Sequence, residues 1–130
     1  MTVSPAPAGH GIKFIRTDCI PETAVIDAKW SNVETSPLCT KLVNSYGVSV
    51  KTVEHVLAAL AGCGINNAIV EIDGSEAPIL DGSAHPFAIE FIRNGLVHSS
   101  ETLKVIRILK EVTFKSESGW AKLFPCDEPW

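Results

Sequence analysis

The sequence lacks the features that mark membrane and secreted proteins. No apolar run approaches the ~20 residues that a transmembrane helix needs. The N-terminus, MTVSPAPAGHG, has neither a basic segment nor a long apolar segment, so we expect no signal peptide. The four cysteines are widely spaced and include no CxxC pair, which favours free thiols in a reducing compartment. We therefore expect a cytoplasmic protein.

The sequence also lacks an excess of positive charge. It has 11 Lys and Arg residues against 15 Asp and Glu residues, which gives a formal net charge of −4. Nucleic acids and anionic membrane surfaces are bound through basic faces, so neither is an expected partner. With 130 residues, 45% of them hydrophobic, the chain is long enough for one domain with a buried core.

The pattern of apolar residues predicts an α+β fold. Alternation indicates strands at 11–18 and 66–73, a hairpin within 40–51, and two strands joined at a Ser-Glu-Ser-Gly turn near the end. A second helix begins at Pro86 and is expected to direct Phe87, Ala88, Phe91 and Ile92 inward. We predict a two-layer sandwich with two helices packed on one face of a mostly antiparallel or mixed sheet.

The clearest predicted element is a helix that follows Lys51. Thr52 is the expected N-cap, and Gly62 and Gly64 are expected to end the helix. Its apolar positions recur at i, i+3, i+4 and i+7, which predicts one buried stripe made of Val53, Val56, Leu57 and Leu60.

Glu54 and His55 lie side by side in the first turn of that helix. Unpaired backbone N–H groups there favour an ionised carboxylate and disfavour the imidazolium, and neutral imidazole is the form that binds a metal. Capping by Glu54 with an ordinary histidine beside it is the alternative. A catalytic zinc site needs about three protein ligands, and the chain has no HExxH, HxxxH or HxH motif. The residues alone leave both interpretations open.

Other candidate sites are weaker. Asp81-Gly82-Ser83 lacks the G-x-S-x-G context of a nucleophile, so we interpret it as a turn that prepares the second helix. Cys63 lies between two glycines at a helix end, where packing is the expected role. His10, His85 and His98 stand alone in the sequence.

One long run is similar to a known family. TVEHVLAALAGCGINNAIVEIDGSEAPILDGSAHPF closely resembles the amino-terminal domain of the UDP-3-O-acyl-N-acetylglucosamine deacetylases, zinc enzymes of lipid A biosynthesis in Gram-negative bacteria. SPAPAGHGIKFIRTD, SPLCTKLVN and IRILKEVTFKSESGWAKLFP resemble flanking pieces of the same domain. The resemblance covers essentially the whole chain.

The resemblance implies a zinc ligand at His55 and, at Glu54, the general base that activates water for removal of acetate from the UDP-acyl-sugar. It also implies a second domain that supplies the other zinc ligands from an HxxxD motif, which this sequence lacks. Residues 1–130 are thus expected to be a single domain without the family's opening strands and without its second domain. We expect the isolated chain to be inactive and to self-associate through an exposed sheet edge. The alternative is a non-catalytic protein-interaction domain on the same scaffold.

Overall fold

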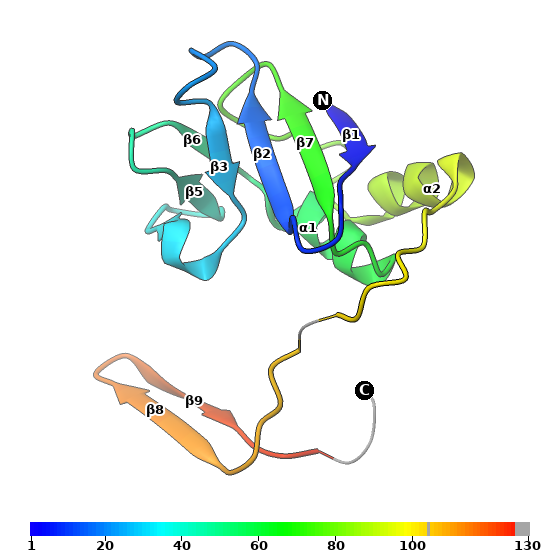
Figure 1. Ribbon diagram of the computed structural model, residues 1–130. Helices are drawn as coiled ribbons and strands as arrows, with labels where there is room; N and C mark the ends of the chain where they lie inside the picture. Colours follow the sequence, from blue (N-terminus) through cyan, green and yellow to red (C-terminus); the bar gives the residue numbers. More distant parts are fainter. Residues whose placement is uncertain (104, 127–130) are drawn as a thin grey trace.

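The computed structural model describes residues 1–103 and 105–126, and its main element is a four-stranded mixed sheet (Figure 1). The strands lie in the order β1 (Thr2–Pro5), β7 (Ala68–Ile72), β2 (Ile12–Arg16) and β3 (Val25–Asp27). β7 and β2 run parallel, whereas β1 pairs with β7 and β3 with β2 in antiparallel register.

The two central strands form because their sequences alternate. In β7 the side chains of Ala68, Val70 and Ile72 are buried and Glu71 is exposed, as the alternation predicts. Phe14 of β2, opposite Val70, is fully buried. β1 lies at the edge of the sheet, the position at which a strand tolerates proline.

A smaller antiparallel sheet follows β3. A single 3-10 turn, η1 (Trp30–Asn32), leads into β4 (Val33–Glu34), which pairs with β5 (Lys41–Val43), and β5 pairs with β6 (Ser49–Lys51). The hairpin predicted within 40–51 is therefore confirmed. The Arg16 guanidinium donates a hydrogen bond to the Ser49 carbonyl at 2.6 Å and so joins the two sheets.

Helix α1 (Glu54–Gly62) ends as its glycines predict. Gly64 has φ +70°, and the Gly64 and Ile65 N–H groups donate to the carbonyls of Ala61 and Leu60 at 3.0 and 2.8 Å. These two bonds form a Schellman motif, in which the left-handed residue is most often glycine. Helix α2 (His85–Asn94) begins with proline in its first turn and ends at Gly95.

Two predictions about the helices are wrong. Thr52 is not the N-cap of α1: Val53 occupies that position, no side chain caps the helix, and the hydroxyl of Thr52 is bonded to Glu76. Its φ of +57° lies outside the extended region that an N-cap residue adopts. Ile92 does not point inward but is 66% exposed, because α2 packs through Phe87, Ala88 and Phe91.

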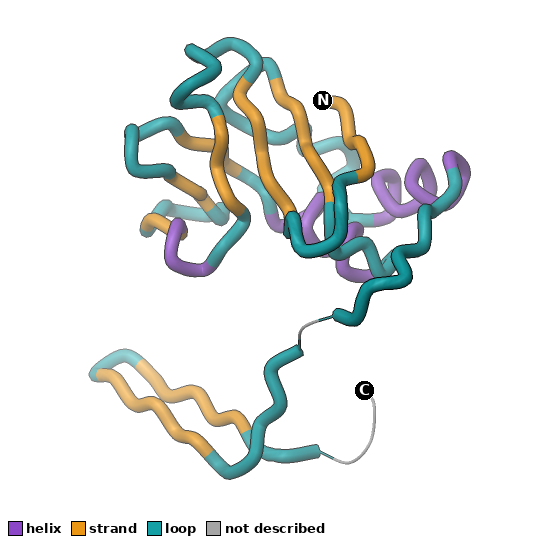
Figure 2. The backbone as a smooth tube through the Cα atoms, viewed as in Figure 1, coloured by secondary structure: helices purple, strands orange, loops and turns teal. Residues whose placement is uncertain are grey.

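The core lies between the main sheet and the helices, and the predicted two-layer α+β fold is confirmed. Figure 2 shows α1 behind the lower end of the main sheet and α2 to its right. The strands are divided among three sheets rather than joined in one. The buried apolar side chains that form the core are Phe14, Ile26, Leu42, Val50, Val53, Val56, Ala59, Leu60, Ala68, Val70, Ile72, Ala77 and Phe87.

The last two strands form the predicted hairpin, but they make a sheet of their own, which was not predicted. β8 (Val112–Ser116) and β9 (Gly119–Leu123) pair only with each other, and every residue in them is exposed. Figure 1 shows the hairpin beyond an extended connection that leaves α2. Among the described residues, no helix is long and apolar enough to cross a bilayer.

Candidate functional site

Glu54 and His55 are the first two residues of α1. The helix begins only two residues after β6 ends, so the small sheet delivers the chain directly to the helix start. Both side chains are half-buried. The structure thus places this adjacent pair at the surface end of a helix whose next turns, through Val56 and Leu60, enter the core.

The carboxylate of Glu54 is held by the loop before β5. Its Oε2 accepts a hydrogen bond from the backbone N–H of Thr40 at 2.9 Å. Burial alone would raise the pKa of Glu54. The hydrogen bonds from Thr40 and from its own N–H, together with the charge of His55, lower it by more than burial raises it, so the net pKa lies below the usual value. Glu54 is therefore an ionised, oriented carboxylate at neutral pH.

The imidazole of His55 is accessible. His55 is half-buried beside Glu54 and is not one of the core residues, although Val53 and Val56 on either side of the pair are. An accessible imidazole can bind a metal ion, and an ionised carboxylate beside it can act as a base.

The described residues do not complete a metal site. Within 1–103 and 105–126, no three His, Cys, Asp or Glu side chains lie close enough together to hold an ion. A catalytic zinc site takes about three protein ligands. His55 can be one of them, and the rest of such a site would have to come from elsewhere.

The weaker candidates do not join this pair. His10 contacts the Gly11 carbonyl through Nδ1, and His85 and His98 are exposed. The interpretation of Asp81-Gly82-Ser83 as a turn is confirmed, since Asp81 accepts bonds from the N–H and hydroxyl of Ser83. Cys63 packs toward the Ala88 carbonyl of α2 at 3.9 Å.

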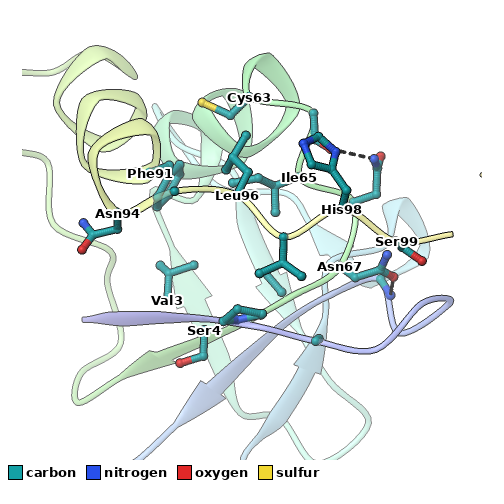
Figure 3. Close-up of a pocket in the computed structure, with 18 of the residues that line it drawn as sticks. Val3, Ser4, Cys63, Ile65, Asn67, Phe91, Asn94, Leu96, His98 and Ser99 are labelled. Atoms are coloured by element: carbon teal, nitrogen blue, oxygen red, sulfur yellow. Dashed lines mark hydrogen bonds between the residues drawn. The ribbon is translucent and has the colours of Figure 1, made fainter.

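A large apolar cavity lies away from the Glu54–His55 pair. Its volume is about 1310 Å³, it is open to solvent on one side, and it is lined by residues of β1, the end of α1, α2 and the segment 95–103. Figure 3 shows Phe91 of α2, Leu96 and Ile65 along one side, with Val3 and Ser4 of β1 below them. Neither Glu54 nor His55 lines it, so the chemistry of the pair belongs to the surface at the start of α1 rather than to this cavity.

Two contacts of the site were not predicted. The bond from Thr40 to Glu54 joins residues 14 positions apart, and that from Thr52 to Glu76 joins residues 24 apart. Neither pair has a fixed spacing that a sequence pattern could reveal. Thr52 carried a signal, a hydroxyl next to the helix start, but that signal predicts a cap.

Comparison with known proteins shows the family of this chain. The family model of UDP-3-O-acyl N-acetylglycosamine deacetylase matches residues 1–129. The chain belongs to this family. Curated relatives named UDP-3-O-acyl-N-acetylglucosamine deacetylase include those of Idiomarina loihiensis, 46% identical over 127 residues, and Shewanella halifaxensis, 43% identical over 125 residues.

The match covers nearly all of this chain but less than half of each relative. It spans 98% of the chain and 41% of the Idiomarina protein, and 96% of the chain and 40% of the Shewanella halifaxensis protein. The match to the relative from Shewanella oneidensis, which is 42% identical, spans 96% of the chain and 40% of that protein. Most of each relative's length therefore has no counterpart in these 130 residues.

Proposed function

We propose that this chain is the first-domain part of a zinc-dependent deacetylase that removes acetate from UDP-3-O-acyl-N-acetylglucosamine, a step of lipid A biosynthesis. The observation that carries the proposal is the oriented Glu54 carboxylate beside the accessible His55 in a chain of this family. The proposed roles are general base for Glu54 and zinc ligand for His55.

The two residues divide the reaction between them. Zinc, when bound, lowers the pKa of water toward ~7 and polarises the acetamide carbonyl. Glu54 takes a proton from the water as its oxygen attacks the carbonyl carbon. That proton passes to the amide nitrogen as the C–N bond breaks, which releases acetate and the free amine. The low pKa of Glu54 keeps its carboxylate ready to accept the proton at neutral pH.

We propose that residues 1–130 act as one domain of a longer assembly and are inactive alone. His55 supplies one ligand where about three are needed. Beyond α2, the chain exposes apolar side chains that a partner would cover: Val97, Val105, Ile106, Leu109, Phe114 and Trp120 are 68–93% exposed. Large apolar side chains left exposed in this number are typical of a protein interface. The expected partner is the remaining part of the deacetylase.

The free edge of the main sheet favours a second candidate, a non-catalytic interaction domain that self-associates. β1 pairs with β7 on one side only, and an edge strand can pair with another chain. Sedimentation of the 130-residue chain, alone and with the second part of a relative, separates the candidates. A complex with that part supports the enzyme, and self-association that the part cannot displace supports the interaction domain.

We also propose a cytoplasmic location. Cys19, Cys39 and Cys63 form no disulfide in the structure, which suits a reducing compartment.

Fusion to a relative tests the proposed function. Residues 1–130 would replace the matched segment of the Idiomarina loihiensis protein, and release of acetate from UDP-3-O-acyl-N-acetylglucosamine would be measured with and without a zinc chelator. We expect a chelator-sensitive activity in the fusion and none in the isolated chain. A folded fusion that binds zinc but releases no acetate would refute the proposal.

A further inference from the structure

Thr52 connects β6 to α1 in a strained conformation. Its φ is +57°, a left-handed value that is unfavourable for a β-branched residue. Two other described non-glycine residues, Leu38 and Leu80, also have positive φ, but both are exposed, whereas Thr52 is only 6% exposed. A strained backbone persists where its surroundings hold it, so the contacts of Thr52 indicate what maintains the turn.

A carboxylate holds the side chain of Thr52. The hydroxyl donates to Oε1 of Glu76 at 2.6 Å, a short bond of the charge-assisted kind. The backbone on either side of Glu76 also holds the preceding residue: Lys51 N–H donates to the Ser75 carbonyl at 2.9 Å, and Ala77 N–H donates to the Lys51 carbonyl at 3.0 Å. The segment after β7 thus fixes both the end of β6 and the turn that follows.

This turn determines where α1 begins. Val53, the next residue, is fully buried, and its carbonyl accepts the first helical bond, from Leu57 N–H at 3.0 Å. Glu54 follows immediately and reaches the Thr40 N–H. A change in the backbone direction at Thr52 would therefore redirect Glu54 and His55 together.

We propose that Thr52 and Glu76 are positioning residues, whose hydrogen bond holds the strained turn so that Glu54 and His55 keep their orientation. Glycine would adopt the same φ without strain but would lack the hydroxyl, which explains a threonine at this position. The functional meaning rests on the proposed deacetylase. The claim that this bond holds the orientation of Glu54 and His55 is independent of the proposed function. It can be tested on the 130-residue chain without metal or substrate.

Amide hydrogen exchange at Thr40, followed by NMR, reports the orientation of Glu54. In Thr52→Val and Glu76→Ala we expect Thr40 N–H to exchange about tenfold faster or more, because its acceptor moves away, while Val70 N–H in the main sheet is unchanged. Thr52→Ser keeps the hydroxyl and should match the wild type. Thr17→Val is the matched control, since it removes a threonine hydroxyl that donates to the Ile72 carbonyl at 3.3 Å.

A merely structural role predicts a different result: exchange would rise at Thr40 and Val70 alike. That outcome, or wild-type exchange at Thr40 in the folded variants, would overturn the proposal. If Thr52→Val does not fold, Glu76→Ala alone tests the proposal, because Glu76 is exposed and its replacement should leave the fold intact.

The fused enzyme provides a second readout. Misplacing a catalytic group by about 1 Å can reduce the rate about 10²-fold. We therefore expect Glu76→Ala to lower kcat by ~10- to 100-fold and to change KM less. An unchanged kcat would contradict a positioning role. An inactive wild-type fusion would count against the proposed function alone, since the exchange experiment decides the geometric claim by itself.

Discussion

Glu54 accepts a hydrogen bond from the backbone N–H of Thr40 at 2.9 Å, although 14 residues separate them in the chain. The bond joins the start of α1 to the loop before β5. It contributes to the low pKa of Glu54 and restricts the directions in which the carboxylate can point. Its consequence is an ionised carboxylate at a fixed position beside His55.

Replacement of Glu54 by glutamine tests the role of base. The amide can still accept from Thr40 but cannot take a proton from water. In the fused enzyme we expect Glu54→Gln to lower kcat by about 10²- to 10⁴-fold, the usual contribution of a general base. Acetate release under saturating substrate measures this change.

Glu71→Gln is the matched control, because Glu71 is an exposed glutamate in the middle of β7. It should keep wild-type activity. Full activity in Glu54→Gln would show that another group takes the proton.

Asn44 connects the turn of the β5–β6 hairpin to β3. Its amide nitrogen donates to the carbonyls of Thr23 and Val25 at 2.6 and 2.9 Å, and its oxygen accepts from the N–H groups of Tyr46 and Val48, both at 3.0 Å. Asn44→Ala leaves these groups without partners, so we expect the free energy of unfolding to fall by about 1–3 kcal/mol. Urea denaturation measures the loss.

Asn94→Ala serves as its control. Asn94 is exposed at the end of α2, and its side-chain amide donates to the Glu90 carbonyl at 2.8 Å. We expect a change within about 0.5 kcal/mol. Equal losses in the two variants would refute a special role for Asn44.

Asp27 makes stability depend on pH in the acid range. The hydrogen bond from Lys29 lowers the pKa of Asp27, burial opposes this, and the charge of Lys13 adds to the lowering, so the net pKa lies below its ordinary value. Because the pKa of Asp27 is lower in the folded state, its ionised carboxylate stabilises the protein at pH values above the pKa of the unfolded state. This stabilisation is lost as the pH falls through the pKa of the folded state.

The stability difference between wild type and Asp27→Asn should therefore be constant from about pH 7 to about pH 5 and should shrink below about pH 4. Urea denaturation at several pH values measures it. Asp73→Asn, at an exposed position, controls for general acid effects. A difference that grows toward low pH would contradict the assigned interaction.

The elements with strong local patterns were predictable from sequence. Alternation located β2 and β7, and the apolar stripe with Gly64 located α1 and its end. The N-cap was predicted wrongly because a threonine before a helix is the usual signal, whereas here Glu76 competes for the hydroxyl. Ile92 was misplaced because both faces of α2 carry apolar residues, and only packing against α1 selects one.

The sequence could nominate Glu54 and His55 as a candidate site but could not predict their contacts. Glu54 and His55 stand out through their place at a helix start and through the TVEH run. The Thr40 and Glu76 contacts depend on how the small sheet and the segment after β7 meet the helix, which no local pattern encodes. The roles of Glu54 as base and of His55 as zinc ligand remain predictions.

Zinc content is the most direct test of the central claim, that His55 binds the metal. His55→Ala and His85→Ala would be made in the fused enzyme, since each histidine lies in the first turn of a helix and His85 is exposed. Bound zinc would be measured after dialysis against zinc-free buffer. We predict about one zinc per molecule in the wild type and in His85→Ala, and a loss of about 90% or more in His55→Ala, as expected when one of about three ligands is removed. Full zinc occupancy in a folded His55→Ala enzyme would contradict the account.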